Sequence, residues 1–247
     1  MSKFAHDTIV PYKQSNQSKK EQVAEMFDNI AFRYDFLNRF LSAGIDVSWR
    51  KKAINKLKDI NPQNILDVAT GTGDVAILTA KMLKPAKITG IDISEGMLEV
   101  GRKKIKDLGL GQTIELLSGD SEKINFPDHN FDAITVAFGV RNYQNLEKGL
   151  QEMYRVLKPG GKLVVLEFSK PKNVLFKSFY NFYMNYIAPG FGKMVSKNRS
   201  AYQYLNDSVQ KFPEGQNFIN IMEKYGYTNM GFKPLTMGIC TLYWGIK

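Results

Sequence analysis

The fold is decided by residues 65–74, which read ILDVATGTGD. Four apolar-rich residues predict a short β-strand, a loop with two glycines follows, and a helical pattern begins at Asp74. Glycines in such a loop let the backbone approach a ligand closely at the carboxyl end of the strand, where open α/β sheets bind ligands. We therefore expect Asp67, Gly71 and Gly73 to lie at a binding site.

Strands and helices alternate on both sides of this loop. Short apolar strands that alternate with helices indicate a parallel sheet covered on both faces, which is a doubly wound α/β fold. The pattern predicts strands over 64–68, 87–92, 113–117, 131–138 and 162–168, helices over 74–83, 94–108 and 146–157, and, after an interruption, a helix near 216–225 with closing strands near 227–233 and 238–245.

We expect one domain with two additions. Residues 1–20 are polar and predict a flexible tail. Residues 21–60 predict a helical cap, because apolar residues recur at Val23, Met26, Phe27 and Ile30. The remaining residues, 61–247, form the main domain, with an insertion over 169–210.

Composition excludes several classes of protein. The 247 residues fit one large domain, and no run of 18 apolar residues predicts a transmembrane helix. One cysteine, Cys240, and two histidines, His6 and His129, argue against a disulfide framework or a metal site. We expect His129 to be an exposed turn residue and the protein to be cytoplasmic.

The net charge of +10 is local. No Asp or Glu occurs between Phe168 and Asn206, whereas this stretch contains six basic residues. Nine of the 29 residues from Phe176 to Tyr204 are Phe or Tyr, and Asn173, Lys177, Asn181 and Asn185 recur every four residues. A basic amphipathic helix with an aromatic face suits an anionic membrane surface or an isoprenoid tail.

Two aspartates at the next strand ends indicate a nucleoside ligand. Asp92 follows Gly73 by 19 residues and is placed to accept hydrogen bonds from ribose hydroxyls, and Asp120 could meet an adenine amino group. The spacing also fits a dinucleotide fingerprint, so NAD is an alternative. However, Asp67 and Asp74 would repel a pyrophosphate at the helix N-terminus, and they favour the cationic S-adenosylmethionine.

Four motifs in order resemble the class I S-adenosylmethionine-dependent methyltransferases. They are LDVATGTGD (66–74), GIDIS (90–94), LSGDSEKINFPDHNFDAIT (117–135) and YRVLKPGGKLVVLEF (154–168). The resemblance implies a Rossmann-like, seven-stranded sheet whose last strand is antiparallel. The loop departs from the usual glycine-rich form at Ala69.

More specific stretches resemble the menaquinone/ubiquinone biosynthesis C-methyltransferases. They are MFDNIAFRYDFLN (26–38), Trp49-Arg50, FGVRN (138–142), LEFSKP (166–171) and AYQYLNDSV (201–209). The resemblance implies methylation of a ring carbon of a polyprenylated quinol, with S-adenosylhomocysteine as the second product. By matched position it places cofactor contacts at Thr72, Asp92, Asp120 and Ser121.

The acceptor site is expected at the end of the fourth strand, in FGVRNY (138–143). Arg141 is permanently cationic and could stabilise a developing phenolate, and Asn142 could hold the other ring oxygen. Tyr34 and Asp35 of the cap are further candidates for closing over the acceptor. The mechanism predicts that the reduced quinol, as its phenolate, is the methyl acceptor.

Two other classes of methyltransferase are alternatives. An RNA methyltransferase would suit the basic charge, but FGVRN replaces the Asn/Asp-Pro-Pro-aromatic sequence of amino-methylating enzymes, and we expect no nucleic-acid partner. A methyltransferase for another small molecule would share the cofactor site, so only an acceptor assay separates it.

Overall fold

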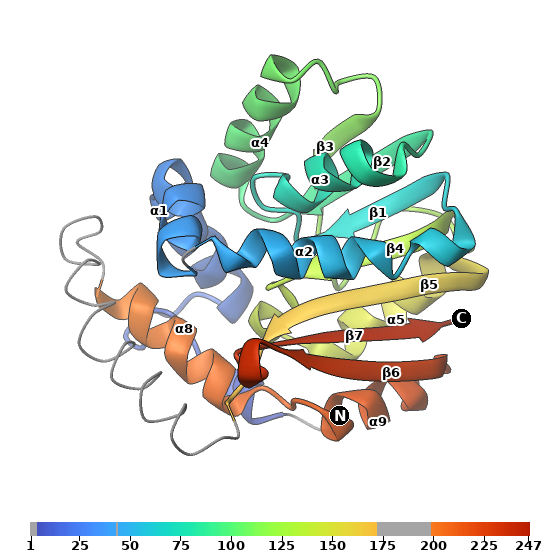
Figure 1. Cartoon of the computed structure of the whole chain (residues 1–247). Coiled ribbons are helices and arrows are strands. Elements are labelled where there is room, and N and C mark those ends of the chain that lie inside the picture. Colours follow the sequence, from blue (N-terminus) through green and yellow to red (C-terminus); the bar gives the residue numbers. More distant parts are fainter. Residues whose placement is uncertain (1–3, 43, 172–198) are drawn as a thin grey trace.

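The computed structural model describes residues 4–42, 44–171 and 199–247. Its centre is a seven-stranded sheet with the order β3-β2-β1-β4-β5-β7-β6 (Figure 1). The strands are β1 (Asn64–Val68), β2 (Lys87–Asp92), β3 (Ile114–Ser118), β4 (Phe131–Ala137), β5 (Leu157–Phe168), β6 (Thr228–Leu235) and β7 (Cys240–Ile246). The first five are parallel, and β7 pairs antiparallel with both β5 and β6. The predicted doubly wound sheet with an antiparallel last strand is confirmed.

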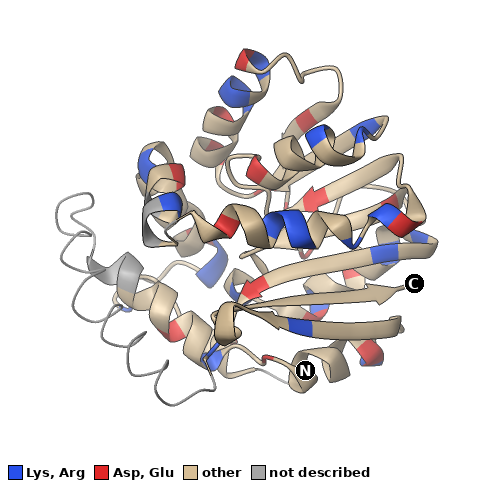
Figure 2. Cartoon of the chain, viewed as in Figure 1, with Lys and Arg blue, Asp and Glu red and all other residues tan. Residues whose placement is uncertain are grey.

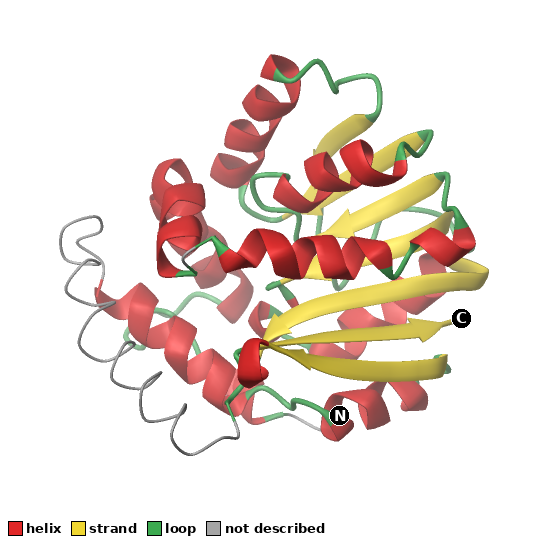
Figure 3. Ribbon diagram, viewed as in Figure 1, coloured by secondary structure: helices red, strands yellow, loops and turns green. Residues whose placement is uncertain are grey.

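Helices cover both faces of this sheet (Figure 3). One core contains residues of α2 (Ile45–Asn55), α3 (Asp74–Leu83) and α4 (Glu95–Asp107). The other contains residues of α5 (Leu146–Val156) and α9 (Gln216–Lys224). Side-chain caps begin two of these helices: Met97 N–H donates to Ser94 Oγ, and Lys148 N–H donates to Asn145 Oδ1.

The cap helix α1 (Lys19–Leu41) and helix α8 (Arg199–Lys211) lie beside the carboxyl ends of the parallel strands (Figure 1). Short 3-10 turns are η1 (Ala5–Thr8), η2 (Lys58–Ile60), η3 (Val140–Asn142) and η5 (Thr236–Gly238). The predicted aromatic face of the insertion falls at residues 172–198, which lie outside the described residues. None of the described helices has the length and apolar character needed to cross a membrane.

The start of the chain differs from the expected frayed tail. His6 is fully buried and packs edge-on against Phe212, with 5.7 Å between ring centroids. Lys19 Nζ donates to the His6 carbonyl oxygen at 2.7 Å, and Gln22 Oε1 accepts from Tyr12 N–H at 2.8 Å. The tail prediction is wrong here because a composition rich in polar residues does not reveal these long-range contacts.

Acidic and basic residues are interspersed along the described elements (Figure 2). Helix α4, for example, carries acidic and basic residues along its length. Most of the acid-free basic stretch lies outside the residues that the structure describes, so the basic face stays a prediction.

Candidate functional site

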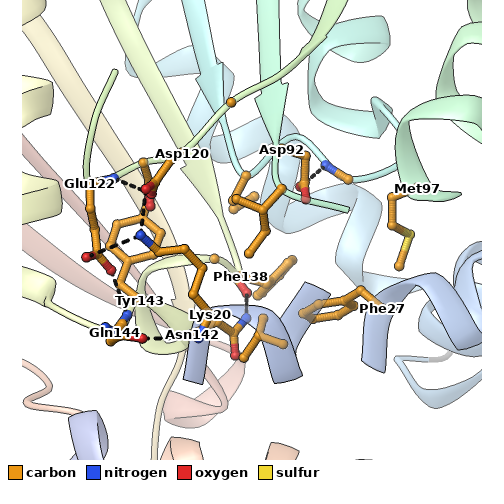
Figure 4. Close-up of a pocket in the computed structure, with 18 of the residues that line it drawn as sticks. Lys20, Phe27, Asp92, Met97, Asp120, Glu122, Phe138, Asn142, Tyr143 and Gln144 are labelled. Carbon is orange, nitrogen blue, oxygen red and sulfur yellow. Dashed lines mark hydrogen bonds and ion pairs between the residues drawn. The ribbon is translucent and has the colours of Figure 1, made fainter. Parts of the chain in front are cut away.

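The carboxyl ends of β1, β2, β3 and β4 meet at one edge of the sheet and border a cavity under α1 (Figure 4). We call this space the cofactor cavity. It is lined by residues of the predicted motifs, among them Gly71, Asp92, Asp120, Ser121 and Asn142. A smaller space of about 370 Å³ adjoins it along the loop of residues 69–73, which we call the glycine loop. Tyr34 lines both spaces.

Asp92 is held in place by backbone groups. Its Oδ2 accepts from Gly71 N–H at 2.8 Å, and its Oδ1 accepts from Ser94 N–H at 2.9 Å. Burial raises the pKa of Asp92, while these N–H donors favour its charged form. Each carboxylate oxygen has two lone pairs, and two such acceptors side by side suit a diol.

Asp120 is paired with a residue that the sequence analysis did not select. Lys20 of α1 reaches across the cofactor cavity, where its Nζ lies 2.5 Å from Asp120 Oδ2 and 3.7 Å from Glu122 Oε2 (Figure 4). Glu122 Oε1 in turn accepts from the backbone N–H groups of Gln144 and Asn145. The cap helix is therefore bound directly to the loop after β3.

The glycine loop owes its shape to left-handed backbone conformations. Gly71 and Gly73 have φ values of +57° and +75°, and Ala69 adopts +54° although it has a side chain. A methyl group in place of the Gly139 hydrogen would lie 2.6 Å from the Ala69 Cβ. Gly139 is thus needed so that the loops after β1 and β4 can approach each other.

Asp67 lies below this loop and supports it. Its two oxygens accept hydrogen bonds from Thr70 Oγ1 and Thr135 Oγ1, each at 2.6 Å. Burial raises the pKa of Asp67 to about 6. Asp67 lines the smaller space, but its carboxylate is directed to these two hydroxyls.

Thr72 and Asp35 join the loop to the cap. Thr72 Oγ1 donates to Asp35 Oδ1 at 2.6 Å, and Lys104 Nζ donates to Asp35 Oδ2 at 2.7 Å. Lys104 also pairs with Asp74 in the first turn of α3, at 2.5 Å. This carboxylate occupies the end of the helix where a pyrophosphate would bind, which disfavours a dinucleotide.

Arg141 is not among the residues that line the cofactor cavity, although we expect it at the acceptor site. Its Nη1 lies 2.6 Å from Glu167 Oε1, both side chains are buried, and the guanidinium also donates to the Phe138 carbonyl oxygen. Burial raises the pKa of Glu167, although Arg141 and two backbone N–H groups favour the charged form. The guanidinium is thus held by buried partners, as a buried cation requires, and the contact with a phenolate that we expect for Arg141 stays a prediction.

Asn142, the next residue, does line the cofactor cavity. Its Oδ1 accepts from the Tyr204 hydroxyl at 3.0 Å, and its Nδ2 donates to the Phe138 carbonyl oxygen at 3.3 Å. The Arg141–Glu167 pair therefore fixes the turn from which Asn142 reaches the cavity.

Comparisons with known proteins decide the family. Residues 15–247 match the model of the ubiE/COQ5 methyltransferase family. The chain is a member of this family. It is 51% identical to "Demethylmenaquinone methyltransferase" of Bacteroides fragilis, covering 99% of both chains, and 50% identical to "Ubiquinone/menaquinone biosynthesis C-methyltransferase UbiE" of Geotalea daltonii, covering 93% of this chain and 97% of the other.

Solved structures support the fold of this ubiE/COQ5 family member. A methyltransferase of Thermotoga maritima, described as a possible histamine N-methyltransferase, aligns with a TM-score of 0.61 at 19% identity, over 90% of this chain and 98% of the other. Phosphoethanolamine N-methyltransferase 2 of Haemonchus contortus, with S-adenosyl-L-methionine, aligns with a TM-score of 0.60 at 16% identity, over 90% and 60%. The expected class I methyltransferase fold is confirmed.

The cavity residues of this ubiE/COQ5 family member fit S-adenosylmethionine, its cofactor. Carboxylates lie at three points of the site, which are Asp92, Asp120 and Asp74. The loop glycines have no side chains, so the backbone lies next to the space between these carboxylates. Ile93 and Met97 provide apolar surface between Asp92 and the cap. A negatively lined site with an apolar wall suits a cationic nucleoside.

The site also contains residues without a sequence motif. Lys20, Met97 and Gln144 line the cofactor cavity, and Lys104 holds Asp35. Both histidines lie outside the site. His6 is buried against Phe212, and His129 is exposed, as expected.

Proposed function

We propose that this protein transfers a methyl group from S-adenosylmethionine to a ring carbon of a polyprenylated quinol, converting demethylmenaquinol to menaquinol. The observation that carries the proposal is the 51% identity, over 99% of both chains, to a protein named for this reaction. S-adenosylmethionine supplies a methyl group that a sulfonium makes electrophilic. The chain must bind the electron-rich ring, orient it and exclude water, and such positioning contributes ~7–11 kcal/mol.

In this proposal the cofactor is held by the motif residues. Asp92 accepts from the ribose hydroxyls, Asp120 and Ser121 face the adenine, and Gly71, Thr72 and Gly73 follow its other end. Asp67 supports the loop from below through Thr70 and Thr135.

The acceptor is oriented by Asn142 and Tyr34. Asn142 lines the cofactor cavity and retains one N–H for a ring oxygen. Burial raises the pKa of the Tyr34 hydroxyl, so this group remains a neutral hydrogen-bond donor. Arg141 is a positioning residue for Asn142, and Asp35 closes the cap through Thr72 and Lys104.

The test is transfer of labelled methyl from S-adenosylmethionine to chemically reduced demethylmenaquinone in detergent. The oxidised quinone is the control, and a reduced polyprenyl benzoquinone is a second acceptor, because a relative at 50% identity is named for both pathways. Label on the reduced naphthoquinone ring alone is expected. Tight binding of S-adenosylhomocysteine with no label on any acceptor would refute the quinol assignment.

We also propose that the protein acts in the cytoplasm and contacts an anionic membrane surface transiently. The support is the acid-free stretch with six basic residues between Phe168 and Asn206, together with the lipid tail of the acceptor. Cosedimentation with vesicles should require anionic lipid and weaken with salt. Equal binding to neutral vesicles would contradict this role of charge.

A further inference from the structure

A second large cavity lies outside the cofactor cavity, between the start of the chain and α8. It is open to solvent and is lined by residues 8–14 on one side and by Gln203, Tyr204 and Asp207 on the other. We call it the N-terminal groove. Ile9, Val10, Pro11 and Tyr12 give it an apolar wall.

One cluster of packed apolar side chains lies between the groove and the cofactor cavity. Its buried members are Val23, Met26 and Tyr204, and Ile9, Tyr12, Phe27 and Ile93 pack against them. Val23, Phe27 and Ile93 line the cofactor cavity, whereas Ile9, Tyr12 and Tyr204 line the groove. This cluster is separate from the two cores that cover the faces of the sheet.

Tyr204 links the groove to the wall of the cofactor cavity. Its side chain lines the groove, and its hydroxyl donates to Asn142 Oδ1, at the wall of the cofactor cavity, over 3.0 Å. A single side chain therefore separates the groove from a residue placed at the acceptor ring. The polar residues Lys13, Gln14 and Gln203 are exposed around the same groove.

We propose that the N-terminal groove binds the isoprenoid tail of the acceptor. This inference rests on the proposed function, because it assumes a ring in the cofactor cavity that carries a long hydrocarbon chain. The tail must leave the ring site, and the groove is the apolar-walled space on the other side of the shared cluster. Burial of its methylene groups against Ile9, Val10 and Tyr12 supplies binding free energy that a short acceptor lacks.

The experiment compares reduced demethylmenaquinones with one and with four isoprene units, at a fixed detergent concentration. For each protein, the quantity measured is the ratio of kcat/KM for the long acceptor to that for the short one. Val10→Asp and Ile9→Asp should lower this ratio about tenfold, because each variant puts a carboxylate into the apolar wall, where it must lose its hydration when the tail binds. Leu108→Asp is the matched control, since Leu108 is an exposed apolar residue at the end of α4, and it should keep the wild-type ratio.

Binding of S-adenosylhomocysteine shows that each variant is folded. If Ile9→Asp fails to fold, Val10→Asp decides, because Val10 is not part of the apolar cluster. A photoreactive group at the end of a two-isoprene tail should label residues 8–14 and 203–207, as mapped by mass spectrometry.

The results separate this inference from the proposed function. If the wild-type protein methylates neither acceptor, the proposed function fails. If it methylates both and the groove variants keep the wild-type ratio, or the label appears only in other segments, the tail binds elsewhere and the inference is overturned.

Discussion

The sheet side and the cap side of the cofactor cavity hold their polar groups in different ways. On the sheet side, Asp67 and the Arg141–Glu167 pair are buried and make short contacts to neighbouring strands and turns. On the cap side, Lys20 and Asp35 are about one-third exposed and reach partners far away in the sequence. Buried pairs are costly to break, whereas exposed pairs contribute little to stability. The sheet side is therefore a rigid base, and the cap is held by weak, reversible contacts.

The largest expected effect comes from breaking the buried pair on the sheet side. Glu167→Ala leaves the Arg141 guanidinium buried without its carboxylate, and we expect the free energy of unfolding to fall by about 3–5 kcal/mol. Urea denaturation measures the change. The double variant Glu167→Leu with Arg141→Met should lose less than Glu167→Ala alone. A loss below about 1 kcal/mol in Glu167→Ala would contradict the rigid base.

The second prediction uses the pH dependence of Asp67. Its pKa is about 6 in the folded protein and 3.8 for the ordinary group. Between these values the folded protein keeps a proton that the unfolded chain has lost, so the free energy of unfolding falls as pH rises from about 4 to 6. The free energy of unfolding of Asp67→Asn, measured relative to wild type, should therefore rise by about 3 kcal/mol across this pH range.

Asp132→Asn is the control for this prediction. Asp132 accepts from two backbone N–H groups and Lys158, and its pKa lies below the ordinary value although burial opposes this. Its difference curve should have the opposite sign at acidic pH. A flat difference curve for Asp67→Asn would show that Asp67 titrates normally.

The same contrast explains what the sequence could predict. Parallel strands end at one edge, so the loop at 69–74, Asp92 and Asp120 were placed together from strand pattern alone. Asn142 could be located because it follows the fourth strand. The positions of these residues follow from local sequence patterns and from the general topology of open α/β sheets.

The cap contacts could not be predicted in this way. Lys20 lies 100 residues from Asp120 in the chain, and Lys104 lies 69 residues from Asp35. No periodicity encodes such pairs, and each lysine resembles an ordinary solvated helix residue. The burial of Arg141 was missed for a similar reason, because its partner Glu167 lies within an apolar strand pattern.

A third prediction weakens the cap without altering the base. Asp35→Asn removes the charge that pairs with Lys104 and weakens the bond to Thr72. Because these groups are partly exposed, stability should change by less than ~1 kcal/mol, and the Kd for S-adenosylhomocysteine should rise by about fivefold or less. Calorimetry at low and high salt measures both, and the effect should shrink with salt. Glu115→Gln, which breaks an exposed pair with Lys87 outside the site, should leave the Kd unchanged.

The smallest expected effect is an increase in affinity. Lys20 occupies Asp120 Oδ2, the acceptor that we assign to the adenine amino group, so the cofactor must compete with its ammonium group. Lys20→Met removes the competitor and keeps the aliphatic stem, and the Kd for S-adenosylhomocysteine should fall about two- to fivefold, as expected for loss of a partly exposed ion pair. Lys87→Met, which breaks the pair with Glu115, is the control. Weaker binding in Lys20→Met would instead mean that the cap holds the cofactor through this lysine. Both sides of the cavity would then contribute to cofactor affinity.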